Sequence, residues 1–162
     1  MQASSSITSS AARRGPMRQS LELAQRTVRV LDRFSPVVDV VIRVFIAMVF
    51  FTSGLTKIAS WSTTVALFEN EYAVPLLAPQ VAAALGTAVE LGFPVLLVLG
   101  LGTRLSAFVL FVFNIIAVIS YPDLSDAGLK DHMLWGALML VTFFYGPGKI
   151  SLDYLLQRRA GR

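Results

Sequence analysis

The sequence of 162 residues lacks cysteine and has a single histidine, His132. Without cysteine thiols the chain can neither exchange disulfides nor bind an iron–sulfur cluster by itself. One histidine is also too few for bis-histidine haem ligation or for a histidine cluster that binds a metal. We therefore expect no metal site and no intrinsic cofactor, and the sequence leaves open whether the protein is an enzyme.

Charged residues are scarce too, at 15% of the chain, whereas 55% of the residues are hydrophobic. Soluble globular domains carry about 25% charged residues. Four apolar runs suit helices that cross a bilayer, the last one when its polar ends sit in the interfaces. The sequence thus predicts an all-α integral membrane four-helix bundle, with helices at residues 37–58, 76–101, 104–121 and 131–147.

The residues before the first span fall into two stretches. Residues 1–17 are rich in Ser and Ala and show no apolar periodicity, so we expect a disordered extension rather than a signal peptide. Residues 18–36 combine an apolar stripe with several arginines, which favours a basic amphipathic helix on an anionic membrane surface; a solvated linker is the alternative. The Ser35-Pro36 pair is expected to end this helix.

The distribution of Lys and Arg predicts the topology. These residues gather before the first span, in the loop at Arg104 and in the tail at residues 149–162, whereas the other two loops are acidic. We expect the four-helix domain, residues 37–148, to lie in the inner (plasma) membrane of a bacterium. The positive-inside rule then places both termini in the cytoplasm. The net charge of +4 follows from this pattern, so we expect no nucleic-acid partner. Short interfacial helices are expected at residues 63–71 and in the C-terminal tail.

Three polar residues of the predicted spans, Arg43, Glu90 and Asn114, lie at similar depths when residues are counted from the ends of their helices. An isolated charge in hydrocarbon is costly, so Glu90 is expected to pair with Arg43. Such a pair either fixes how the first two helices dock or belongs to a polar pocket for a ligand headgroup. A protonated Glu90 without a partner is the third interpretation.

Five further residues fall in the layer nearer the outer surface: Lys57, Glu69, Asp131, His132 and Trp135. They offer an ammonium group, two carboxylates, an imidazole that exchanges protons near neutral pH and a flat apolar wall. Together these groups suit a polar aromatic ring such as a quinone headgroup. Taken singly, they are also typical of a membrane interface, where Trp forms belts and Lys snorkels to water.

Five conspicuous segments follow Arg43: FFTSGLTKI, ALFENEYAVP, AVELGFPVLLVLGLGTR, DHMLWGALML and GPGKISLDYLL. Their order and spacing resemble those of the DoxX family of small bacterial membrane proteins. The resemblance implies a four-helix inner-membrane bundle. It also implies an association with redox systems, because the family is named for a relative of the membrane subunit of a thiosulfate:quinone oxidoreductase. The residues that match the family's recurrent positions are Arg43, Ser53, Gly54, Lys57, Glu69, Glu90, Arg104, Asp131, Trp135, Gly146, Gly148 and Asp153.

The first functional hypothesis is an inner-membrane protein that binds a quinone or a similar amphipathic ligand. It would serve as an accessory or anchor subunit of a redox or stress-response system, with the lipid bilayer and either a membrane redox enzyme or a soluble subunit as partners. Two other classes stay open: a non-enzymatic scaffold or chaperone for another protein, and a small transporter of a hydrophobic weak acid that uses Glu90. Small residues on the first two spans also allow a homo-oligomer.

Overall fold

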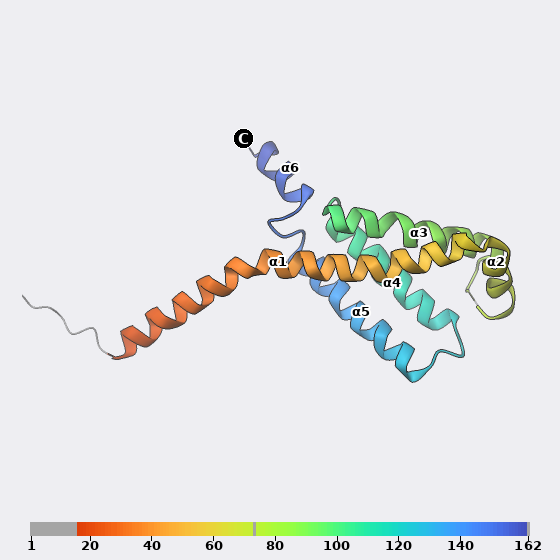
Figure 1. The fold of residues 1–162 in the computed structure, drawn as a ribbon, viewed down its shortest axis with the longest axis horizontal. Coiled ribbons are helices and arrows are strands. Elements are labelled where there is room, and N and C mark those ends of the chain that lie inside the picture. The colour runs from red at the N-terminus through yellow and green to blue at the C-terminus, as the bar shows by residue number, and fades with distance from the viewer. Residues whose placement is uncertain (1–15, 73, 162) are drawn as a thin grey trace, which may run out of the picture. The chain divides into compact units, whose positions relative to one another are not determined.

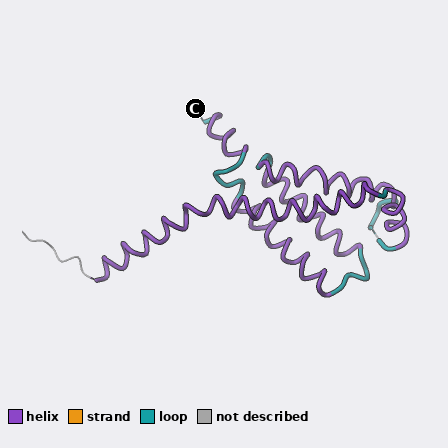
Figure 2. The backbone as a smooth tube through the Cα atoms, in the orientation of Figure 1, coloured by secondary structure: helices purple, strands orange, loops and turns teal. Residues whose placement is uncertain are grey.

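The computed structural model describes residues 16–72 and 74–161, and all of the regular structure in them is helical (Figures 1 and 2). The prediction of an all-α fold is confirmed. The predicted disorder of residues 1–17 falls almost wholly outside the described residues. The helices are α1 (Pro16–Ala59), α2 (Trp61–Asn70), α3 (Pro79–Leu99), α4 (Thr103–Ser120), α5 (Asp126–Tyr145) and α6 (Leu152–Ala160).

The chain divides into two compact units, Met1–Phe34 and Ser35–Arg162. In the first unit, the described side chains from Ser20 onward are exposed along α1. The predicted end of this helix at Ser35-Pro36 is wrong, because α1 continues through Pro36. A proline removes one backbone donor and crowds the carbonyl four residues earlier, which a long helix tolerates at a local cost.

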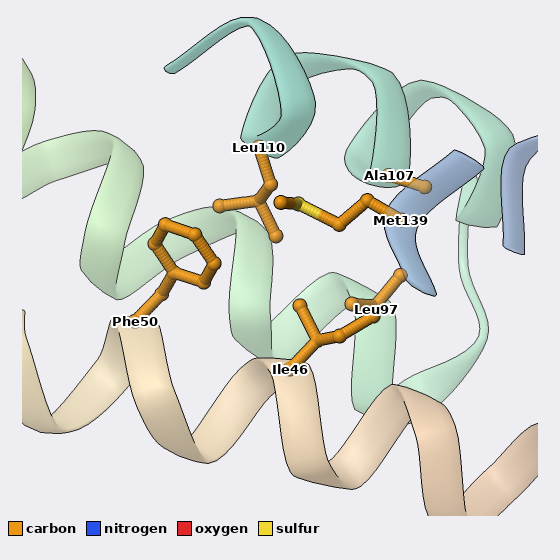
Figure 3. Close-up of a cluster of buried hydrophobic side chains, with 6 residues drawn as sticks. All are labelled: Ile46, Phe50, Leu97, Ala107, Leu110 and Met139. Carbon is orange, nitrogen blue, oxygen red and sulfur yellow. The ribbon is translucent and has the colours of Figure 1, made fainter. Parts of the chain in front are cut away.

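In the second unit, α3 and α5 both pack on α4, and α2 packs on α3. The hydrophobic core lies where four helices meet (Figure 3). The part of α1 after Ser35 joins this core through two large apolar side chains. The buried core residues are Ile46 and Phe50 of α1, Leu97 of α3, Ala107 and Leu110 of α4, and Met139 of α5.

Three of the described helices are long and apolar enough to cross a membrane: the Ser20–Ala59 part of α1, α3 and α4. Large apolar side chains such as Met48, Val98 and Phe108 are exposed on them, as expected for surfaces that face lipid. The protein is therefore a multi-pass helical membrane protein. Helix α5 does not reach this apolarity, since its first two turns carry Asp126, Lys130 and Asp131, and its role as a fourth span stays a prediction.

The helix ends agree with the sequence in part. Helix α2 covers most of the short helix expected at residues 63–71, and α5 ends at Gly146, where φ is 87°. Helix α5 begins at Asp126 instead of residue 131, because the Ser125 hydroxyl accepts a hydrogen bond from Gly128 N and caps the helix. Helix α3 begins at Pro79 instead of residue 76, and Pro is well suited to a first helical turn.

The end of the bundle where α6 begins is held together by two charged residues, and we call it the α6 end. Arg43 is only 1% exposed and donates hydrogen bonds to the carbonyl oxygens of Asp39, Leu97 and Ile150. Asp153 accepts hydrogen bonds of 2.8 Å from the backbone N–H groups of Gly102, just before α4, and of Thr103, its first residue. The two side chains thereby tie α6 and the segment before it to α1, α3 and α4.

The Asp153 carboxyl lies outside the membrane-spanning helices. Its partial burial alone would raise its pKa, but the hydrogen bonds from Thr103 and Gly102, with the charge of Arg43, hold the pKa below the usual range of an aspartate. Because the folded-state pKa is lowered, the ionised carboxylate stabilises the fold at neutral pH. This contribution is lost as the pH falls through the folded-state pKa.

We expect Asp153→Asn to lower the free energy of unfolding by about 1 kcal/mol at neutral pH, because an amide presents only one acceptor oxygen to two N–H donors. Thermal unfolding of the detergent-solubilised protein measures this loss. The difference from the wild type should vanish in strongly acidic buffer. The exposed Asp123 of the α4–α5 loop provides the control, and an equal loss in Asp123→Asn would contradict a capping role for Asp153.

Candidate functional site

An ion pair joins α1 to α3 inside the bundle. Lys57 Nζ lies 2.7 Å from Glu90 Oε1 and 2.6 Å from Glu90 Oε2, and it also donates to Ser53 Oγ at 2.9 Å. The Glu90 side chain is 5% exposed and that of Lys57 is 16% exposed. Ser53 Oγ donates in turn to Glu90 Oε1 at 3.1 Å. The two charges therefore neutralise each other in a largely desolvated position.

A glycine lets the two helices approach closely enough for this pair. A Cβ atom on Gly54 would lie 2.8 Å from Leu91 Cδ2 and 3.1 Å from Glu90 Cβ, so a side chain there would force the Leu91 side chain to move and crowd Glu90. Gly54 is one turn from Lys57 on the same face of α1, which brings the ammonium group over α3. Close approach through a small residue is the usual device for packing membrane helices.

The predicted pair of Arg43 and Glu90 is wrong, because Lys57 occupies the place expected for Arg43. Counting residues along the helix axes placed Lys57 and Glu90 in different layers. Side chains of a helix lean toward its N-terminus, so Glu90 reaches toward the start of α3, while the long Lys57 side chain covers the rest of the difference. Arg43 spends its donors on backbone carbonyls at the α6 end instead.

Asn114 of α4 holds His132 of α5 with two hydrogen bonds. Asn114 Nδ2 donates to the His132 carbonyl oxygen at 3.0 Å, and Asn114 Oδ1 lies 2.7 Å from His132 Nδ1. Since Asn114 uses its amide protons on the carbonyl, its Oδ1 accepts the proton of Nδ1. In its neutral form the imidazole then has Nε2 free to act as an acceptor. Trp135 lies edge-on to this ring, with 4.8 Å between the ring centroids.

Lys57, Glu90, His132 and Trp135 border a cavity of about 540 Å³ that is lined by residues of α1 to α5 and of the loops after α2 and α4. We call it the α2-end cavity. Its walls are mostly apolar and rich in aromatic rings: Phe50, Phe68, Tyr72, Phe113, Tyr121 and Trp135. Besides the tyrosine hydroxyls, its polar groups come from Ser53, Lys57, Glu90, Ser120 and His132.

The sequence-predicted site residues separate into two groups. Lys57, His132 and Trp135 line the cavity together, in line with the expected convergence. Glu69 and Asp131 are exposed and are not among its lining residues, and Glu69 accepts a hydrogen bond from Gln80 Nε2 at 2.6 Å. Glu90 thus lines the cavity in place of these two carboxylates, and ligand binding at this site stays a prediction.

The sequence analysis missed a tyrosine pair at the cavity. The ring centroids of Tyr72 and Tyr121 lie 5.2 Å apart, and those of Tyr72 and Phe68 lie 4.8 Å apart. Burial raises the pKa of Tyr72, and the neighbouring Tyr121 and Glu90 raise it further. Both tyrosines lie in loops that adjoin spans, where no periodic pattern marks the direction of a side chain.

Among the residues that the structure describes, no three His, Asp or Glu side chains come close enough together to hold a metal ion. The α2-end cavity thus offers hydrogen bonds and one neutralised ion pair among aromatic walls. Such a lining suits the binding of an uncharged ring that carries oxygen atoms.

Comparison with known proteins identifies the family. The model of the DoxX family matches residues 38–122, which cover the described parts of α1 after Pro36, α2, α3 and α4. An uncharacterized protein of Haemophilus influenzae is 30% identical over an alignment of 127 residues that covers 73% of this chain and 82% of that protein. No solved structure gave a significant match. On the family match and this relative, the chain belongs to the DoxX family.

Proposed function

We propose that this DoxX-family protein binds a quinone headgroup, or a closely similar amphipathic ring, in the α2-end cavity. The observation that carries the proposal is the meeting of the Lys57–Glu90 ion pair and the oriented His132 in one aromatic-walled cavity. The protein would act as an accessory or anchor subunit of a redox or stress-response system, as the resemblance to its family implied.

The size and walls of the cavity support this ligand class. Cavities that bind small molecules usually measure about 300–1,000 Å³ and combine apolar walls with a few polar groups. The rings of Phe50 and Trp135 pack edge-to-face with centroids 6.1 Å apart, which forms a rigid wall for a flat ligand. A sugar or another highly polar ligand would find too few hydrogen-bond partners here.

The hydrogen-bonding capacity of the polar residues points the same way. Glu90 accepts three hydrogen bonds and a carboxylate offers about four acceptor positions, so one position stays open. His132 Nε2 offers a second acceptor. A ring hydroxyl can donate to either of them, and a ring carbonyl can replace one of the two contacts that Lys57 makes with Glu90.

The rim of the cavity explains how a ligand with an apolar tail would enter. Leu85 of α3 and Ile116 of α4 both line the cavity and are exposed on the surface of the bundle. Since α3 and α4 are candidate membrane spans, this rim opens toward lipid. An amphipathic ligand can place its ring in the cavity and leave its tail in the bilayer.

For the topology we propose that both termini are cytoplasmic and that the α2-end cavity lies near the periplasmic face of the inner membrane. The support is the concentration of arginines before the first span and in the tail, and the acidic character of the loops after α2 and α4. The ligand would then exchange with a partner at the periplasmic side.

We expect the gently purified protein to retain a quinone, detected by native mass spectrometry and organic extraction. Glu90→Gln should lower quinone occupancy at least about tenfold, because a hydrogen bond to a charged group contributes about 1.5–3 kcal/mol. Glu69→Gln is the matched control, since Glu69 is an exposed carboxylate outside the cavity.

Because Glu90→Gln also breaks the ion pair, Ser53→Ala provides a second variant that keeps both charges, with a smaller expected loss of quinone. Equal quinone content in all four proteins would overturn the proposal. So would a wild-type protein that carries no quinone and instead co-purifies with another protein, which would favour a scaffold.

The topology is tested with an alkaline phosphatase, which is active only in the periplasm, fused after Arg162 in an intact Gram-negative host. We expect no activity from this fusion and strong activity when the same enzyme is inserted at Asp123 in the α4–α5 loop. The reverse pattern would show that the cavity faces the cytoplasm.

A further inference from the structure

Ser120 carries a buried hydroxyl that the fold itself does not use. It is the last residue of α4, it is 1% exposed, and its Oγ has no hydrogen-bond partner among the described residues. A buried hydroxyl without a partner is costly, and a helical serine usually bonds the carbonyl four residues earlier. A hydroxyl that is buried at this cost suggests a hydrogen-bond partner outside the protein chain.

The position of Ser120 allows such a partner, because Ser120 lines the α2-end cavity. Two other buried hydroxyls lack partners in the described residues, those of Thr103 and Ser106, but both lie at the opposite end of α4 and neither lines the cavity. The Ser120 hydroxyl is therefore the one of the three that a ligand in the cavity can reach.

Ser120 lies some way from the ion pair along the bundle. Gly86 follows the start of α3 by seven residues and Phe113 precedes the end of α4 by seven, and a Cβ on Gly86 would lie 3.5 Å from the tip of the Phe113 ring, so the two residues lie at similar heights in these antiparallel helices. Glu90 follows Gly86 by one turn, and its side chain leans back toward that level. Ser120 follows Phe113 by seven residues on the same face of α4, which is about 10 Å along the axis.

This separation matches a ring with oxygen atoms on opposite edges. Each oxygen needs a hydrogen bond of about 2.8 Å, and two such bonds plus the width of a six-membered ring span a comparable distance. A single carbonyl group would reach only one of the two polar ends and leave the other unsatisfied.

We propose that Ser120 is a second polar anchor of the cavity, so that the bound ring carries one oxygen toward Lys57 and Glu90 and another, in the para position, toward the Ser120 hydroxyl. This inference rests on the proposed function and narrows its ligand class to para-dioxygenated rings. The hydroxyl donates to a carbonyl oxygen or accepts from a ring hydroxyl, so it serves both forms of such a ring.

The test compares the binding of 1,4-naphthoquinone with that of 1-tetralone, an analogue with one carbonyl group. The chain has two tryptophans, so Trp61→Phe leaves Trp135 in the cavity wall as a single fluorescent reporter. Quenching of Trp135 in detergent micelles then gives Kd for both compounds. The variants are Ser120→Ala, Ser120→Thr and, as the matched control on the same helix, Ser106→Ala.

We expect the reporter protein to bind naphthoquinone about tenfold more tightly than tetralone, as one additional hydrogen bond allows. Ser120→Ala should remove this advantage, whereas Ser120→Thr and Ser106→Ala should keep it. Thr restores the hydroxyl, so it separates a lost hydrogen bond from a repacked helix end.

The outcomes distinguish this inference from the function on which it rests. If naphthoquinone binds and its advantage survives in Ser120→Ala, the second anchor is wrong and the proposed function stands. If neither compound binds to the reporter protein, the proposed function fails, and the second anchor fails with it.

Discussion

The compensation of charge within the membrane is the constraint on which the rest of this structure depends. Glu90 lies in the middle of an apolar helix, where an unpaired carboxylate would be prohibitively costly. Lys57 meets it with two contacts of 2.7 Å or less, and the absence of a side chain at Gly54 lets α1 lie close against α3 beside this pair. The pair thus fixes the docking of two helices, and it places both charges on the wall of the α2-end cavity. One requirement of membrane stability therefore also creates the polar part of the candidate site.

The two ends of the bundle use their charges in different ways. At the α6 end, Arg43 and Asp153 are satisfied by backbone groups, and their contacts close the structure around the turn between α3 and α4. At the α2 end, Glu90, His132 and Ser120 keep hydrogen-bonding capacity that no described protein group uses. Unused capacity beside a cavity is what distinguishes a binding site from a structural network, since buried polar groups are normally satisfied. The hydroxyls of Thr103 and Ser106 at the α6 end also lack partners among the described residues but do not line the cavity, so the cavity beside the unused groups of the α2 end is what favours ligand binding there.

The sequence predicted the helices and the family because both depend on local patterns. Apolar runs, the Gly146-Pro147 stop and the order of the conspicuous segments are all properties of the chain itself. The partner of Glu90 was not predictable by counting residues, because the reach of Lys57 and the gap at Gly54 are properties of two helices together. Nor could the sequence single out Ser120, since a serine in an apolar helix normally bonds its own backbone. Whether it does so becomes visible only in the folded structure.

The α2 end uses a lysine and the α6 end an arginine, and this difference fits a binding role for the first and a structural role for the second. The guanidinium of Arg43 presents a planar fork of donors, and three carbonyl oxygens hold it in one geometry: that of Asp39 one turn earlier in α1 and those of Leu97 and Ile150 from distant parts of the chain. Its contacts cannot be exchanged singly without releasing buried carbonyls. The ammonium of Lys57 is a compact charge on a flexible stem, and two of its three contacts go to the same carboxylate. If a ligand oxygen replaces one of those two contacts, the other still holds the ion pair together. The α2 end can therefore accept a ligand without leaving a charge unpaired.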